Sequence, residues 1–316
     1  MTIAVYHWWQ EQEESPAYSN LAHPILLSIA TLRAVNPTIP IKVVNCSKYF
    51  SDETKQSSDW IHFQEKLDFQ TVGSDFALEQ NYSHIVGYQL LSRIFDIRKQ
   101  IHYPTMYCDS DVFWFRDPLP LACDINKFCF DGFNSGLFYY NPESPIVKEM
   151  FEVFDSYVIT ALRDQSFYNT IKQVTNYNAW PYIWDETILT YMNETGMDHM
   201  FEIVPPREHA FIRTLKDTNL DKIKMLHCNG LIIENPFAKR ETEIRHCRGL
   251  ACLLFKELYE NICKVLDEKD LKMIFTEKEL KNCLAHQFPL LEEYEKLEET
   301  RADDGHYVIQ GTHFII

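Results

Sequence analysis

Stretches of apolar residues alternate with polar segments along the first half of the chain, and their spacing predicts strands and helices in turn. Thr2 to Trp8 and Ile41 to Asn45 are short, apolar and rich in β-forming residues, as strands are. Between them, apolar residues from His23 to Val35 recur on one face of a helix. A strand, a helix and a second strand in this order are typical of a parallel sheet flanked by helices.

The same alternation continues into the second half. A polar loop and a weak strand near Ile61 come next, and a helical stretch from Gly87 to Lys99 leads into a strand at Thr105 to Cys108. Further strands are predicted at Lys127 to Phe130, Leu137 to Tyr140, Phe201 to Val204 and Lys222 to Leu226. From Glu241 onward the spacing becomes helical. We therefore predict an α/β domain over residues 1–240, with a parallel sheet flanked by helices, and a helical subdomain over 241–316.

Composition narrows the choice of partners and compartment. The 316 residues carry 30 basic and 46 acidic side chains, a net charge of −16 that disfavours nucleic acid and anionic membranes. Nine cysteines without a C-x-x-C pair indicate reduced thiols. The N-terminus has no basic segment, and apolar stretches such as Pro24 to Leu32 fall short of the roughly 18 residues that cross a bilayer. These features favour a soluble, cytoplasmic protein with no membrane span.

Two carboxylates follow the strand that ends at Cys108. Asp109 and Asp111 flank Ser110 where a buried strand emerges into a loop. Ligand crevices of parallel sheets lie beyond the carboxyl ends of the strands. Two such carboxylates repel each other unless a cation joins them, and Mg²⁺ or Mn²⁺ takes oxygen ligands of this kind. The alternative is a turn with two Asp side chains.

Three further segments carry candidate chemistry. Asn134 and Ser135 offer donors and acceptors to sugar hydroxyls, and Gly136 allows close approach of the backbone, although an ordinary turn has the same residues. The segment Trp184-Asp185-Glu186-Thr187 has two interpretations. In one, a carboxylate faces the anomeric carbon of a sugar and Trp184 stacks on the sugar ring. In the other, the acidic residues simply begin a helix. His227 follows a strand and is either structural or a third metal ligand.

In this order, the four segments resemble the metal-dependent glycosyltransferases of the GT-A fold, in particular the glycogenin-like branch that uses UDP-sugars. The F-N-[AS]-G segment of that family matches residues 133–136, its D-Q-x-x-L segment matches 185–189, and its H-x-x-G segment matches 227–230. The resemblance extends over residues 1–237. It implies a mixed, mostly parallel central sheet flanked by helices, with a nucleotide-sugar-binding half over 1–111 and a donor and acceptor half over 112–240.

The resemblance also implies roles for single residues. Asp109, Asp111 and His227 would bind Mn²⁺ or Mg²⁺, which bridges the two phosphates of the donor. The residues placed around the donor are Tyr6, His7, Arg93, Ser110, Asp131, Asn134, Ser135, Gly136 and Gly230. Glu186, Asp185 and Arg93 would be catalytic. The implied reaction is hexosyl or pentosyl transfer to a hydroxyl of a glycan, a glycoprotein or another acceptor.

Two departures from the family pattern leave the sugar open. Ile233 stands where the family has a phosphate-binding Lys, for which Lys239 or Arg240 is a candidate replacement. Glu186 stands where the family has Gln, and retaining galactosyltransferases have a Glu facing the anomeric carbon. We therefore expect retention of configuration. The segment 111–118 is also similar to plant-type xylosyltransferases.

Two other functions compete with transfer. Asp109-Ser110-Asp111 is similar to the nucleophile pair of haloacid-dehalogenase-type phosphatases, although Phe113 stands where those enzymes have Thr or Val. A catalytically degenerate module that only binds a nucleotide sugar is the third possibility.

Overall fold

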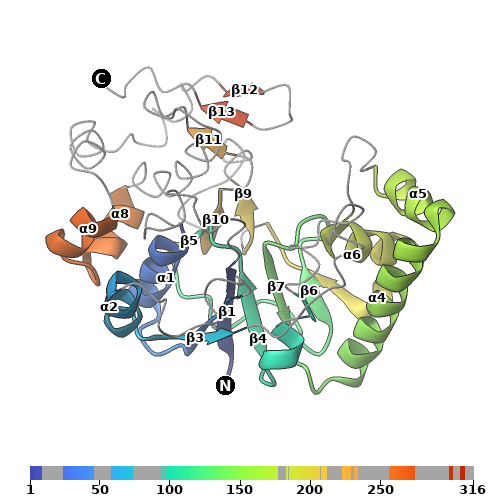
Figure 1. Cartoon of the computed structure of the whole chain (residues 1–316), viewed down its shortest axis with the longest axis horizontal. Helices are drawn as coiled ribbons and strands as arrows, with labels where there is room; N and C mark the ends of the chain where they lie inside the picture. Colours follow the sequence, from blue (N-terminus) through green and yellow to red (C-terminus); the bar gives the residue numbers. More distant parts are fainter. Residues whose placement is uncertain are drawn as a thin grey trace.

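A seven-stranded sheet lies at the centre of the computed structural model (Figure 1). The structure describes residues 1–8, 24–45, 58–73, 94–95, 97–176, 183, 185–206, 208–211, 223–228, 231–233, 256–274, 299–301 and 307–309. The strand order is β3-β2-β1-β4-β7-β6-β8. The strands are β1 (Ile3–Trp8), β2 (Ile41–Asn45), β3 (Phe69–Gly73), β4 (Thr105–Cys108), β6 (Phe128–Phe130), β7 (Leu137–Tyr140) and β8 (Phe201–Ile203).

Six of these strands point the same way. Strands β3, β2, β1 and β4 pair in parallel, β7 is antiparallel to both β4 and β6, and β8 is parallel to β6. The predicted fold class, a mixed and mostly parallel sheet flanked by helices, is confirmed. The carboxyl ends of β1, β4 and β6 consequently lie at one edge of the sheet, the edge where such proteins bind ligands.

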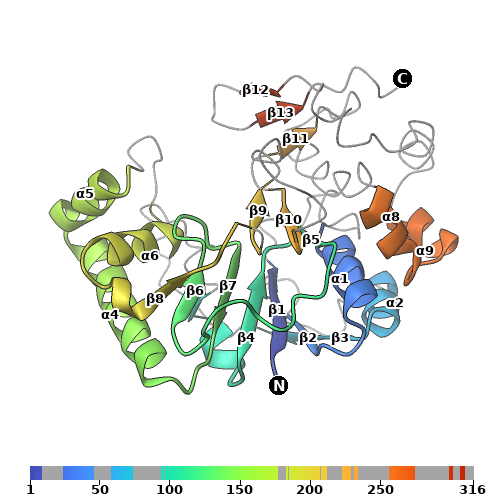
Figure 2. The ribbon, with the colours of Figure 1, turned by 180° about the vertical axis from the view of Figure 1, so that it is seen from behind.

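Helices cover both faces of this sheet. Ala4 and Tyr6 of β1 pack into one apolar cluster with α1 (Pro24–Val35) and α2 (Ser58–Lys66), while Ile3 and Val5 pack into a second cluster on the other face. Helices α4 (Pro145–Arg163), α5 (Gln165–Val174) and α6 (Asp185–Glu194) cover the second face. Figures 1 and 2 show these two groups of helices on opposite sides of β1 and β4. Burial on both faces explains why β1 is a continuous apolar run in the sequence.

A second, smaller sheet stands beyond the end of β4. It has the order β5-β10-β9, with β5 (Val112–Trp114) antiparallel to β10 (Met225–His227) and β9 (Ala210–Phe211) parallel to β10. Strand β10 was predicted at Lys222 to Leu226 but covers Met225–His227, so His227 is its last residue rather than the residue after it. This sheet brings the C-terminal half of the domain against the end of β4.

The weak strand predicted near Ile61 is wrong, because α2 occupies this segment. Trp60, Phe63 and Leu67 are buried at helical spacing, whereas Ile61 is 41% exposed. A strand would place Ile61 and Phe63 on the same face. The next strand, β3, begins only at Phe69.

The residues described after position 240 form two helices and two short strands, and the strands were not predicted. Helices α8 (Lys256–Cys263) and α9 (Glu268–Ile274) bury apolar side chains in the same cluster as α1. Strands β12 (Glu299–Arg301) and β13 (Tyr307–Ile309) form a three-stranded sheet with β11 (Leu231–Ile233). The division at residue 240 stays a prediction. Among the described residues, no helix has the length and apolar character needed to cross a membrane.

Candidate functional site

The Asp-x-Asp segment is the turn between two buried strands. The backbone N–H of Asp109 donates to the carbonyl of Gly136 (2.7 Å) and thereby extends the pairing of β4 with β7 by one residue. The N–H of Val112 donates back to the carbonyl of Asp109 (3.2 Å), and β5 begins there. Both carboxylates are consequently held at the carboxyl end of β4.

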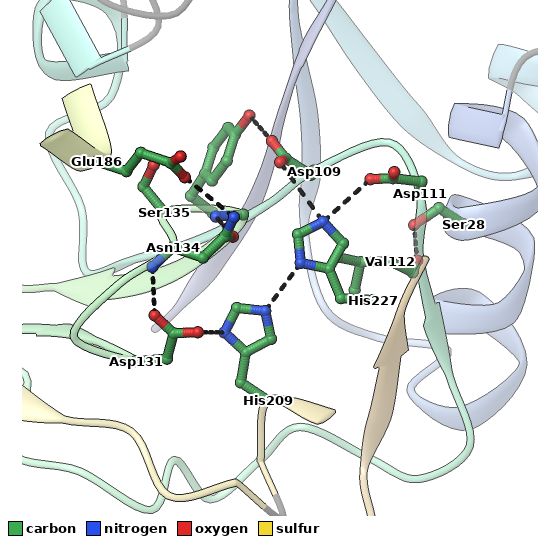
Figure 3. A network of polar contacts seen from close by, with 12 residues as sticks. Ser28, Asp109, Asp111, Val112, Asp131, Asn134, Ser135, Glu186, His209 and His227 are labelled. Carbon is green, nitrogen blue, oxygen red and sulfur yellow. Dashed lines mark hydrogen bonds and ion pairs between the residues drawn. The ribbon is translucent and has the colours of Figure 1, made fainter. Parts of the chain in front are cut away.

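His227 reaches the same turn through the small sheet. It is paired with Val112, and the N–H of the next residue, Cys228, donates to the carbonyl of Asp111 (3.0 Å). The His227 Nε2 atom lies 3.3 Å from Asp111 Oδ1 and 3.7 Å from Asp109 Oδ2 (Figure 3). One potential ligand atom from each of the three side chains lies within 4.8 Å of the others. The structure therefore brings together the three predicted metal ligands.

The charges around His227 favour a positive group at this point. The imidazole is fully buried, which by itself lowers its pKa, but Asp111 and then Asp109 and Asp131 raise it, and the net direction is upward. The same carboxylates attract a divalent cation. Two carboxylates and one imidazole form a donor set that Mn²⁺ accepts. The residues present thus fit a metal ion.

Gly136 is required by the close approach of these side chains. A Cβ atom at this position would lie 2.1 Å from His227 Cε1 and 2.8 Å from Asp109 Oδ2. Such distances lie far inside van der Waals contact. The glycine therefore allows β7 to pass directly beside the three candidate ligands.

The loop before β7 connects this cluster to the start of α6. Asn134 Nδ2 donates to Glu186 Oε2 (3.0 Å), and Ser135 Oγ donates to Asp185 Oδ1 (3.1 Å). Asp185 is buried and Glu186 is half-buried, and both stand in the first turn of α6. The helix-start interpretation therefore holds for the backbone, while the Glu186 side chain faces Asn134 in the site (Figure 3).

The other predicted residues are placed less centrally or lie outside the described part of the chain. Tyr6 is fully buried, burial raises its pKa well above the usual value, and its hydroxyl is hydrogen-bonded to that of Ser28 (3.1 Å). This burial argues against direct contact between the Tyr6 side chain and a nucleotide. His7, at the end of β1, and Ser110, in the turn, are half-buried. The predicted residues outside the described part are Arg93, Trp184, Gly230, Lys239 and Arg240.

Two residues that the sequence did not single out contact the candidate ligands. The Tyr107 hydroxyl donates to Asp109 Oδ1 (2.6 Å), and His209 Nε2 lies 3.0 Å from His227 Nδ1. His209 in turn places Nδ1 3.5 Å from Asp131 Oδ2. A lone His before a two-residue strand gives no signal in the sequence that separates it from a structural histidine.

Fold and site together define an α/β protein with a candidate divalent-cation site at the carboxyl edge of its sheet. No family model and no curated protein matches the sequence. Among solved structures, the chain is similar to glycosyltransferases.

Three of these structures illustrate the similarity. GlyE of Streptococcus pneumoniae TIGR4 is 12% identical, with a TM-score of 0.48 over 84% of this chain and 63% of the GlyE chain. The galactosyltransferase LgtC is 13% identical, with a TM-score of 0.45 over 86% of this chain and all (100%) of the LgtC chain. Mouse xyloside xylosyltransferase 1 is 11% identical, with a TM-score of 0.43 over 72% of this chain and 98% of the mouse chain. The chain therefore spans less than two thirds of the GlyE chain.

Proposed function

We propose that the protein is a metal-dependent glycosyltransferase that moves a sugar from a nucleotide-diphosphate donor, a UDP-sugar, to an acceptor hydroxyl. The observation that carries this proposal is the convergence of Asp109, Asp111 and His227 beyond the carboxyl end of β4. Three ligands from the protein leave room in the coordination sphere of Mn²⁺ or Mg²⁺ for phosphate oxygens.

The acidity of the site makes donor binding depend on the cation. Asp109, Asp111, Asp131 and Glu186 all lie in one network of polar contacts (Figure 3). This network would repel a diphosphate that arrived without a counter-ion. When bound, the metal neutralises the negative charge that develops on the departing nucleoside diphosphate. Asp109 and Asp111 would hold the cation at a fixed place.

Asn134, Ser135 and Glu186 are the groups we assign to the donor sugar. The amide of Asn134 is oriented by two contacts, because its Oδ1 accepts from Gly136 N (2.7 Å) and its Nδ2 donates to Glu186. Glu186 is consequently held beside the cluster of candidate metal ligands. A carboxylate facing the anomeric carbon stabilises the positive charge that grows there as the bond to phosphate breaks. This role of Glu186 supports transfer with retention of configuration.

The donor sugar is a hexose or a pentose in this proposal, and the acceptor is a glycan, a glycoprotein or another molecule with a free hydroxyl. We also propose that Arg93 contacts the donor and that Lys239 or Arg240 replaces the missing phosphate-binding Lys. Each of these residues is tested by substitution with Ala, which should weaken donor binding without changing the affinity for Mn²⁺.

The function is tested by measuring UDP release from a panel of UDP-sugars with Mn²⁺ and with a chelator. Turnover that needs Mn²⁺ and disappears in Asp109→Asn and Asp111→Asn supports the proposal. Thermal stabilisation by a UDP-sugar that requires Mn²⁺ supports the donor site, because a ligand that binds only the native state raises the melting temperature.

Two results would replace this proposal with another function. Hydrolysis of aryl phosphates in the absence of any sugar transfer would support the phosphatase. Binding of UDP-sugars without turnover, in the presence of candidate acceptors, would support a binding module.

A further inference from the structure

We propose that Asp131 and His209 are positioning residues that set the tautomer of His227 and so keep its Nε2 lone pair directed at the cation site. This inference rests on the proposed function, because it concerns the use of His227 as a metal ligand. Neither residue is assigned to the metal by the sequence pattern.

Three side chains form a continuous series of contacts that ends at the two carboxylates. Asp131 Oδ2 lies 3.5 Å from His209 Nδ1, and His209 Nε2 lies 3.0 Å from His227 Nδ1. His227 Nε2 then faces Asp111 Oδ1 and Asp109 Oδ2. Figure 3 shows the series running from Asp131 through both imidazoles toward Asp109 and Asp111. Each imidazole thus uses one ring nitrogen toward Asp131 and the other toward the cation site.

The backbone fixes which oxygen of Asp131 meets His209. Asp131 Oδ1 accepts the N–H groups of Phe133 (2.8 Å) and Asn134 (2.5 Å). The carboxylate is therefore locked by the loop that follows β6, and Oδ2 is left to face the imidazole. At 3.5 Å this contact is longer than an ideal hydrogen bond. It still determines the tautomer, because a nitrogen lone pair would be repelled by the nearby negative oxygen whereas an N–H is attracted.

The contact between Asp131 and His209 Nδ1 determines the tautomers of both imidazoles in turn. A neutral imidazole has one N–H and one lone pair. With Nδ1–H of His209 directed at Asp131, the Nε2 lone pair of His209 faces His227 and accepts its Nδ1–H. The Nε2 atom of His227 is then the one available to a metal. Metal-ligating histidines commonly donate their second ring N–H in this way, and such partners fix the orientation of the ring.

The two imidazoles are held in fixed positions relative to each other. Both are buried, and their ring planes are nearly parallel, with an interplanar angle of 19° and a centroid distance of 5.2 Å. His227 ends β10 and His209 directly precedes β9, and these two strands are paired in parallel. Burial removes the competing water that would otherwise satisfy either tautomer.

The substitution Asp131→Asn tests the inference because it reverses the polarity of the series with little change in shape. The two backbone N–H groups keep the amide oxygen where Oδ1 was, so the NH₂ group faces His209 Nδ1. His209 is then expected to carry its proton on Nε2 and to donate it to His227 Nδ1. The lone pair of His227 is thereby drawn away from the cation site.

Two measurements report the result. In metal-free protein with ¹⁵N-labelled histidine, ring chemical shifts should show His209 as the Nδ1–H tautomer in the wild type and as the Nε2–H tautomer in Asp131→Asn. The affinity for Mn²⁺ alone, followed by the EPR signal of the free ion, should fall by about 10- to 100-fold.

A matched control separates this effect from loss of a loop contact. Asp164 caps α5 by accepting the N–H groups of Ser166 (2.8 Å) and Phe167 (3.4 Å), at the same spacing as the contacts of Asp131. Asp164→Asn should leave both the His209 tautomer and the Mn²⁺ affinity unchanged.

A second pair of variants covers the case in which Asp131→Asn does not fold. His209→Gln can present an oxygen to His227 Nδ1, whereas His209→Leu cannot. We expect Mn²⁺ affinity close to that of the wild type in the first and a loss of at least about tenfold in the second. Equal affinities in these two variants would overturn the inference, as would an unchanged His209 tautomer together with unchanged Mn²⁺ affinity in Asp131→Asn. Failure of the wild type itself to bind Mn²⁺ would instead refute the proposed function.

Discussion

Gly136→Ala adds a single methyl group at the point where β7 passes the candidate metal ligands. The new Cβ would lie 2.1 Å from His227 Cε1, whereas two carbon atoms in contact are about 3.5–4.0 Å apart. The ring of His227 would have to move by more than about 1 Å to relieve the overlap. Asp109 Oδ2, 2.8 Å from the same Cβ, limits the direction of that movement.

We expect Gly136→Ala to weaken Mn²⁺ binding more than it lowers the stability of the fold. Overpacking of one methyl group typically costs about 1–3 kcal/mol of stability, which a domain of this size tolerates. Metal–ligand distances, by contrast, tolerate only about 0.2 Å. Displacement of His227 by more than that distance removes one of three protein ligands. We therefore expect the affinity for Mn²⁺ to fall by at least about tenfold while the protein remains folded.

The assay is a titration of Mn²⁺ followed by EPR, together with thermal unfolding of the same samples. Gly73→Ala at the end of β3 is the control, because a Cβ there would meet no atom within 4 Å. It should leave both measurements close to those of the wild type. Wild-type affinity for Mn²⁺ in a folded Gly136→Ala protein would refute the assignment of His227 as a metal ligand.

Three further substitutions test other contacts. Glu186→Gln should lower turnover of a UDP-sugar by about 100-fold or more while UDP binds as in the wild type. NMR of the first product from the wild-type enzyme should show a retained anomer, and an inverted anomer would rule out this role of Glu186. Tyr107→Phe removes the hydroxyl that donates to Asp109 and should weaken Mn²⁺ binding by up to about tenfold, with an unchanged value counting against an orienting role. Asp270→Asn breaks the contacts of α9 with His62 (2.7 Å) and Lys66 (3.1 Å) of α2 and should lower the free energy of unfolding by about 1–3 kcal/mol. Burial raises the pKa of Asp270, but the hydrogen bond with His62 and the contact with Lys66 outweigh it, so the pKa is lowered from 3.8. The stabilisation by Asp270 should therefore be present above about pH 4 and be lost as the pH falls through the lowered pKa, so urea unfolding of wild type and variant should converge only in acid.

The apolar pattern was sufficient to predict most strands of the main sheet, and the four polar segments, through their family resemblance, indicated the candidate metal ligands. Strands buried on both faces are continuous apolar runs, and the pairs at their ends, such as Asp109 and Asp111, stand out against them. A strand was predicted in the segment of α2 because Ile61 is apolar, but the core buries Trp60 and Phe63 instead. Local composition does not show which of several apolar neighbours will face the core.

The amino-acid sequence by itself determined most elements of the sheet and the chemistry available at the ends of its strands, because periodicity and short motifs are local properties of the chain. Tertiary structure alone decided which distant side chains meet. The pairing of β10 with β5 and β9 places His227 between Asp111 and His209, and the pairing of β4 with β7 places Gly136 against His227. It also buried Tyr6 in the core, where its neighbour is Ser28 of α1. Some of these contacts join residues that lie more than a hundred positions apart in the sequence. Only the packing of the strands sets the distances between them.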